Sequence, residues 1–191
     1  MIRRGSMMAV VLLFGVMGLS AHSQDAAKKE AAVKPASSPS QAVLESWNEI
    51  ARKLIAMAED FPEDKYDYRP NPSQRTFAEQ LLHAAGASYF FTNPVNGEKP
   101  PAGEDPKRDK YKTKADVVAF VKKCFEDGAA AIKAKGDAGM TQTVIEPFSK
   151  QQVRIGDLAY GLIEHSGEHY GQLVGYYRSA GMVPPESRPK K

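Results

Sequence analysis

His165 and His169 stand four residues apart, in a stretch whose apolar residues recur with helical spacing. Side chains four residues apart lie on the same helix face, with Cβ atoms about 6 Å apart. Two imidazoles placed in this way can bind one divalent metal ion, each at about 2.0–2.1 Å. The same face carries Leu158, Leu162, Gln172 and Leu173. Because this face is mostly apolar, we expect it to point into a core, where imidazole nitrogens without partners are costly.

His83 is expected in the middle of another helix, within the segment LLHAAG. Gly86 and Ala87 follow one turn later, and their small size leaves room beside the imidazole. That room suits a metal ion with bound water, but it equally suits close packing of two helices. From spacing alone, two interpretations therefore stay open: a metal site of three histidines, or polar histidines satisfied within a core.

Several polar residues are candidates to support the histidines by hydrogen bonds or to line a substrate pocket. They are Glu79, Gln80, Tyr66, Tyr68 and Gln172. Glu79 and Gln80 come one turn before His83, a position from which a side chain can orient a ligating imidazole. The two tyrosines belong to a proline-rich loop, which could instead pack over the end of a bundle.

No catalytic residue is assigned from the sequence. Glu164 and Glu168 adjoin the histidine pair, but each is turned about 100° around the helix, so both are expected at the surface. The pattern H-x-x-E-H also occurs in zinc peptidases, which need a further, usually acidic ligand downstream. Only Glu186 follows, in a proline-rich tail, which disfavours that interpretation. Cys124 falls within an apolar stripe and is expected to be buried rather than nucleophilic.

Apolar periodicity predicts an all-α fold, a bundle of four helices. The expected helices cover residues 39–59, 76–91, 114–135 and 153–180. Capping signals support three of the starts: Ser38 with Gln41, Thr76 with Glu79, and Thr113 with Asp116. Asn93-Pro94 is expected to stop the second helix, and Gly181 the last.

Two connections are less regular than the helices. Residues 93–112 form a long polar segment, so we expect either a crossover along the bundle or a cover over part of it. Residues 136–152 are expected to form a small hairpin or an irregular loop.

The N-terminal residues 1–23 have the three parts of a secretory signal peptide. Arg3 and Arg4 precede an apolar run at 7–19, which is shorter than the roughly 20 residues of a membrane span. Small residues then surround a cleavage site after Ser23. We therefore expect export to the periplasm or the medium, with no stable membrane anchor after cleavage.

The remaining chain is expected to comprise a flexible linker at 24–38, one domain at 39–183 and a disordered tail at 184–191. Cleavage removes two arginines and no acidic residue, which leaves 24 basic against 23 acidic residues. This near-neutral balance gives no support for binding nucleic acid. The single cysteine excludes a disulfide within the chain.

The segments EDKYDYRPNPSQRTFAEQLLHAAGASYF and IEHSGEHYGQLVGYYRSAGMVPP resemble the DinB/YfiT-like family of metal-binding four-helix bundles. The resemblance covers about residues 40–188. The family places one histidine in the second helix and an H-x-x-x-H pair in the last, which here are His83, His165 and His169. Gly-Gln-Leu at 171–173 also matches.

This resemblance implies one divalent ion held by the three histidines, with open positions for water or substrate. Zinc, nickel, iron or manganese would suit such a site. Known members include thiol-dependent S-transferases, a mycothiol-dependent maleylpyruvate isomerase and metal-dependent hydrolases. Export disfavours the use of cytosolic thiols, so we expect a metal-dependent hydrolase acting on a small molecule. An S-transferase-like enzyme, a non-catalytic metal-stabilised binding protein and a homodimer remain open alternatives.

Overall fold

The computed structural model describes residues 35–103 and 105–189. The expected signal peptide and all but the last four residues of the expected linker lie outside the described residues. The segment Ala36–Lys191 forms one compact unit. Within the described ranges, no helix combines the length and apolar character that a membrane crossing requires.

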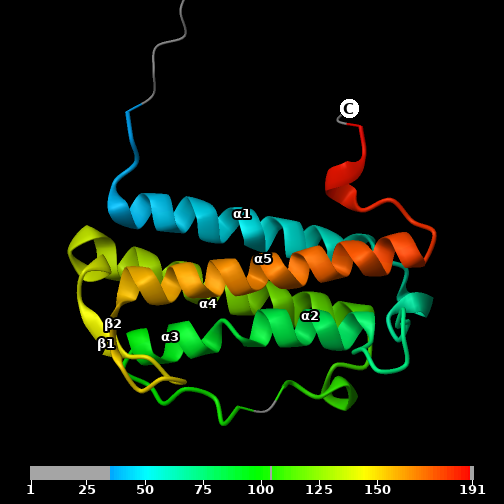
Figure 1. Cartoon of the computed structure of the whole chain (residues 1–191), viewed down its shortest axis with the longest axis horizontal. Coiled ribbons are helices and arrows are strands. Elements are labelled where there is room, and N and C mark those ends of the chain that lie inside the picture. Colours follow the sequence, from blue (N-terminus) through cyan, green and yellow to red (C-terminus); the bar gives the residue numbers. More distant parts are fainter. Residues whose placement is uncertain (1–34, 104, 190–191) are drawn as a thin grey trace, which may run out of the picture. The chain divides into compact units, whose positions relative to one another are not determined.

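The helices of this unit lie side by side along its long axis, in rows of one or two helices (Figure 1). They are α1 (Pro39–Asp60), α2 (Phe77–Gly86) continued by α3 (Tyr89–Val95), α4 (Lys114–Met140) and α5 (Ile155–Ser179). α4 and α5 each pack against both α1 and α2, so they separate those two helices. The fold is therefore mostly helical, as expected, and its second row is broken into two helices.

The second row differs from the expected single helix at 76–91. Thr76 begins it as predicted: its hydroxyl accepts a hydrogen bond from the Glu79 N–H, and the Glu79 carboxylate accepts one from the Thr76 N–H. The break follows Gly86, where the Ser88 hydroxyl donates to the carbonyl of Cys124 in α4. Asn93-Pro94 does not stop the row, which instead ends at Val95, before the left-handed Gly97 (φ 79°).

The connection from α3 to α4 runs back along the bundle, with one 3-10 turn at Arg108–Lys110 (Figure 1). α4 consequently runs parallel to the α2–α3 row. The connection lies directly on α2, because a Cβ added at Gly86 would be 2.8 Å from Cγ of Pro106. The segment is thus both a crossover and a cover, and Gly86 serves close packing rather than open space.

A short hairpin joins α4 to α5, as one of the two expectations for residues 136–152 proposed. The helix α4 keeps regular geometry as far as Lys135 and kinks at Gly136 (φ 58°). Strands β1 (Thr143–Ile145) and β2 (Gln152–Arg154) then pair antiparallel. α5 follows β2 directly, so the hairpin fixes where α5 begins.

The start of α1 is capped differently from the prediction. Pro39 occupies the first turn as expected, but the Ser38 side chain makes no capping hydrogen bond. Asp137, from the end of α4, instead accepts from the backbone N–H of Ser40 (2.9 Å) and from the Ser38 hydroxyl (2.8 Å). Gln41 donates to Glu45 and takes no part in a capping box. A long-range contact therefore replaces the local one.

Aromatic side chains fill the centre of the bundle. Trp47 is 1% exposed, and its indole N–H donates to the carbonyl of Phe125 (2.9 Å). Gly128 of α4 makes room for this ring, since an added Cβ would lie 2.0 Å from Cζ2 of Trp47. Tyr176 and Tyr177 are also buried, so both serve packing within the chain. Cys124 is buried as predicted, and burial raises its thiol pKa to about 12, which makes it unreactive.

The segment after α5 is more ordered than expected. Gly181 (φ 75°) follows the end of α5, as predicted. Residues 184–189 were expected in a disordered tail, but Pro185–Ser187 form a 3-10 turn. Arg188 pairs with Asp60 at 2.6 Å, and Glu186 pairs with Arg52 at 2.7 Å. These ion pairs attach the segment to α1.

Candidate metal centre

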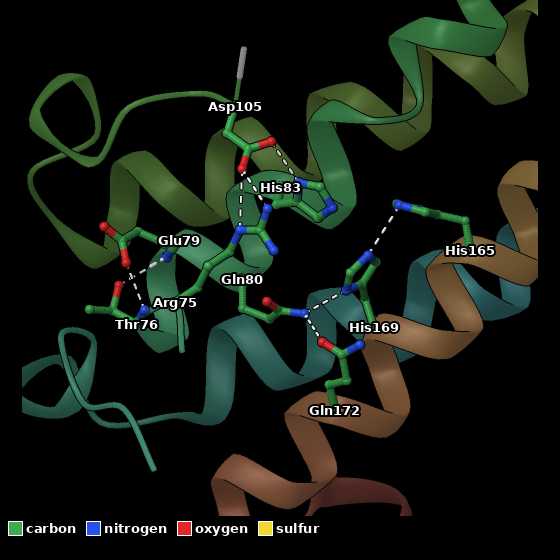
Figure 2. Close-up of polar contacts among 9 residues, drawn as sticks. All are labelled: Arg75, Thr76, Glu79, Gln80, His83, Asp105, His165, His169 and Gln172. Atoms are coloured by element: carbon green, nitrogen blue, oxygen red, sulfur yellow. Dashed lines mark hydrogen bonds and ion pairs between the residues drawn. The ribbon is translucent and has the colours of Figure 1, made fainter. Parts of the chain in front are cut away.

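His83 from α2 and the pair His165 and His169 from α5 turn their rings toward one another (Figure 2). One ligand nitrogen from each residue can be chosen so that all lie within 4.8 Å of one another. The ring centroids of His83 are 4.6 Å from His169 and 5.5 Å from His165. His83 and the His165–His169 pair, which are far apart in sequence, therefore converge at the packing interface of α2 and α5.

The α5 pair has a geometry that suits a shared ion. The two Nε2 atoms of His165 and His169 are 3.1 Å apart. Two ligands with bonds of about 2.05 Å to one tetrahedral ion would be separated by about 3.3 Å. Among the described residues, the other ring nitrogen of His165, Nδ1, is buried without a hydrogen-bond partner, which is uncommon in native structures. The donor set of neutral imidazoles thus fits a divalent ion such as zinc, nickel, iron or manganese.

Two amide side chains hold the ring of His169 in place. Nε2 of Gln80 lies within hydrogen-bond distance of Nδ1 of His169 and donates to Oε1 of Gln172 at 2.6 Å. If both side-chain amides are rotated by 180°, Oε1 of Gln80 accepts a hydrogen bond from Nδ1–H of His169. Nε2 of His169 is then free to bind an ion. The structure thus places Gln80 in contact with His169, and Gln172 in contact with Gln80.

A carboxylate that the sequence did not single out supports His83. Oδ1 of Asp105 lies 2.6 Å from Nδ1 of His83, and Oδ2 accepts from Arg75 at 2.9 Å (Figure 2). A carboxylate only accepts hydrogen bonds, so Nδ1 of His83 carries a proton, and Nε2 is the ring nitrogen left for the cluster. Tyr176 of α5 donates to the backbone carbonyl of Arg75 at 2.6 Å, which anchors this contact to the bundle.

The pKa shifts within the site favour protonation states that can bind a metal ion. Burial, followed by the neighbouring His165 and His83, lowers the pKa of His169 to about 4. Burial and then His83 likewise lower the pKa of His165. For Asp105, burial raises the pKa, but hydrogen bonds from His83 and Arg75 outweigh it, and the net shift is downward. Near neutral pH the α5 pair, His165 and His169, therefore presents uncharged imidazoles, and the Asp105 carboxylate is ionised.

Three residues expected near the site take other roles. Glu79 caps α2 and lies 3.9 Å from Arg69, on the side of α2 away from the histidines (Figure 2). Tyr66 is fully buried, and its hydroxyl donates to the carbonyl of Ala58. Tyr68 packs partly buried against the core. The loop tyrosines thus stabilise the end of the bundle, which was the alternative considered for them.

The adjoining glutamates lie where the helical period places them. Glu164 and Glu168 are both exposed on α5, so neither side chain points into the bundle with the histidines. The prediction that they are surface carboxylates is confirmed. Asp105 is instead the acidic group in contact with the cluster.

A pocket of about 440 Å³ opens beside the cluster and includes His83 and His165 in its wall. This volume is in the usual range for sites that bind small molecules. Most of the lining is apolar, contributed by α5, by the α2–α3 row and by the hairpin. A small substrate could therefore approach the histidines from this side.

The low pKa of His169 predicts that the metal-free protein loses stability in acid. Between pH 6.5, the ordinary pKa, and about 4, the unfolded chain takes up a proton that folded His169 does not bind. The free energy of unfolding therefore increases with pH across this window. As the pH falls from 6.5 to about 4, it decreases by at most about 3 kcal/mol. Urea unfolding of chelator-treated protein would measure it. His169→Gln should flatten the profile, and equal slopes in both proteins would contradict the assignment.

Comparison with known proteins agrees with this fold. The sequence profile of the DinB superfamily matches residues 47–173, which include all three histidines of the cluster. The chain belongs to the DinB superfamily. A search of curated proteins finds no match.

Several solved structures share the fold at low identity. A DinB-like protein from Bacillus cereus ATCC 10987 is 16% identical, with a TM-score of 0.63 over 76% of this chain and 95% of that one. The DinB-like protein YjoA from Bacillus subtilis is 18% identical, with a TM-score of 0.61 over 78% of this chain and 99% of that one. YfiT from Bacillus subtilis is 16% identical, with a TM-score of 0.59 over 79% and 95%. YfiT is described as a probable metal-dependent hydrolase with an unusual four-helix bundle topology.

Proposed function

We propose that this protein binds one divalent metal ion through His83, His165 and His169 and is a metal-dependent hydrolase of a small molecule. The observation that carries the proposal is the convergence of three imidazoles, within 4.8 Å, beside a pocket whose wall includes two of them, His83 and His165. The description of YfiT as a probable metal-dependent hydrolase gives further support. Export through residues 1–23 belongs to the proposal on the sequence pattern alone.

The residues of the chain have distinct roles in this function. A bound divalent ion would polarise a substrate carbonyl and lower the pKa of a bound water molecule. His83, His165 and His169 supply neutral nitrogen donors. Asp105 keeps the proton of His83 on Nδ1, and Gln80 fixes the ring of His169. The apolar pocket binds the substrate and limits the water around it.

The proposal is tested with purified protein that carries no histidine tag, beside a variant with alanine at all three histidines. Elemental mass spectrometry should find about one divalent ion per chain, and none in the variant. The loaded protein should then hydrolyse members of a panel of small esters and amides, and a chelator should abolish the activity. A protein without metal after reconstitution would refute the proposal.

One observation favours a second, non-catalytic function. Asp105, the carboxylate in contact with the cluster, already pairs with both His83 and Arg75. A site whose nearest base is engaged in this way could serve only to join α2 to α5 and stabilise the bundle. Bound metal that raises the unfolding temperature, without turnover of esters, amides or thiol-transfer substrates, would support this role.

A further inference from the structure

The dimensions of the pocket beside the histidines limit the length of the ligand that it can bind. Along α5 its wall is formed by residues spaced three or four apart, which share one face: Leu158, Gly161, Leu162 and His165. From His165 to Leu158 this face extends about 10 Å, at about 1.5 Å per residue. A substrate whose reacting group lies at His165 therefore has about 10 Å along α5 for its chain and the van der Waals contacts at both ends, which an extended chain of about six carbons would fill.

The far end of the pocket is aromatic. Phe90 from α3 and Phe148 from the hairpin both line it, with ring centroids 4.7 Å apart. Phe148 is 71% exposed, although the Glu146 carboxylate fixes its position by accepting from the Phe148 N–H at 2.8 Å. A large aromatic side chain held exposed at a pocket is surface that an apolar ligand would cover.

The charged groups of the pocket disfavour an anionic ligand. Its wall includes three carboxylates, from Asp105, Glu146 and Asp157, and no lysine or arginine among the described residues. Asp105 and Asp157 already pair with Arg75 and Arg154, at 2.9 and 2.7 Å. Away from the histidines, the lining side chains thus offer no cation to a ligand carboxylate, which would meet Glu146 and two carboxylates already paired with arginine.

Gly161 leaves the pocket open. A glycine inside a helix is destabilising by about 0.5–1 kcal/mol relative to alanine. Packing does not require one here, because a Cβ added at Gly161 meets no atom within 4 Å. Since Gly161 lines the pocket, a larger side chain at this position would occupy the space between Phe90 and α5.

We propose that this pocket selects an uncharged, apolar acyl group of about six carbons, placed with its carbonyl at the histidines and its chain beside Leu158, Leu162 and Phe90. The proposal rests on the proposed hydrolase function for its reaction. In that reaction one water molecule is consumed. Its oxygen bonds to the carbonyl carbon, the bond to the departing alcohol or amine breaks, and one water proton goes to that leaving group.

Two substrates of matched length test the selection. 4-Nitrophenyl hexanoate and mono-4-nitrophenyl adipate have acyl chains of six carbons, but the second ends in a carboxylate. With zinc-loaded protein, and after subtracting the rate of the triple-alanine variant, kcat/KM should be at least tenfold higher for the hexanoate. Equal values for the two esters would overturn the proposal.

Gly161→Phe tests the position of the acyl chain. It should lower kcat/KM for the hexanoate at least tenfold while changing that for 4-nitrophenyl acetate less than threefold. Gly175→Phe is the matched control, because Gly175 lies on α5 outside the pocket and also has no neighbour within 4 Å of an added Cβ. It should leave both values unchanged. An equal effect of both substitutions would place the chain elsewhere and overturn the proposal.

A binding measurement separates this proposal from the hydrolase function. Hexanamide and adipamate form a matched pair of slowly hydrolysed amides, and their binding to metal-free protein can be followed by nuclear magnetic resonance. Hexanamide should bind more tightly than adipamate, and Gly161→Phe should weaken it at least fivefold. If hexanamide binds in this way but the metal-loaded protein turns over no substrate, the hydrolase function is refuted and the selection of an apolar acyl group is supported. Equal binding of the two amides would overturn the selection even in an active enzyme.

Discussion

Replacing His169 by alanine is expected to lower the affinity for divalent ions by at least about a hundredfold while leaving the helix content unchanged. The substitution removes one of three nitrogens and leaves the two others on different helices. Loss of an indirect partner of a ligand already costs about 10–100-fold, so loss of the ligand itself should cost more. Calorimetric titration with zinc would measure the affinity, and far-ultraviolet circular dichroism the helix content.

Glu168→Ala is the matched control for this experiment. Glu168 is next to His169 in sequence, but its side chain is exposed on α5. Its removal should leave zinc affinity and stoichiometry unchanged. If His169→Ala still bound one ion per chain with the affinity of the unaltered protein, His169 would not be a ligand and the three-histidine centre would be wrong.

Asp105→Asn is expected to weaken metal binding by about 10–100-fold, the second largest effect. The Asp105 carboxylate accepts from Nδ1–H of His83 at 2.6 Å and keeps Nε2 available. An asparagine amide can instead donate to Nδ1, which would move the ring proton to Nε2 and block the lone pair. Zinc titration of the variant at neutral pH would measure the loss.

Asp67→Asn provides the comparison for this substitution. Asp67 pairs with Arg108 of the same connection at 2.9 Å, so its replacement also removes one charge and one arginine contact. It does not touch the histidines and should leave zinc affinity within about twofold of the unaltered protein. Equal losses in both variants would mean that Asp105 acts only through the general charge of this surface.

The parts of the site that were predictable are those that the helical period determines. A spacing of four residues places His165 and His169 on one face of any helix, whatever the rest of the fold. The same period predicts that Glu164 and Glu168 point away from this face, and both are exposed in the structure. The capping box at Thr76 is equally local, so the start of the helix that carries His83 was also found.

The parts that were missed depend on contacts between distant segments. Asp105 lies in a connection without periodicity, and only the fold of that segment onto α2, through Pro106 against Gly86, brings it to His83. The length of this connection suggested that it covers something, but no local pattern identifies the residue involved. Tyr66 was misplaced for the same reason, because its hydroxyl bonds to a backbone carbonyl of α1.

Trp47, the only tryptophan of the chain, gives this protein an optical reporter of its own folding. Its buried indole packs against Phe91 and Phe125, whose ring centroids are 5.1 and 5.9 Å away. Neither of these ring contacts involves a histidine of the metal centre. Fluorescence emission should therefore move to longer wavelength when the bundle opens to water, and stay constant when only the ion leaves. A single emission scan would then distinguish a substitution that empties the metal centre from one that unfolds the helices around it.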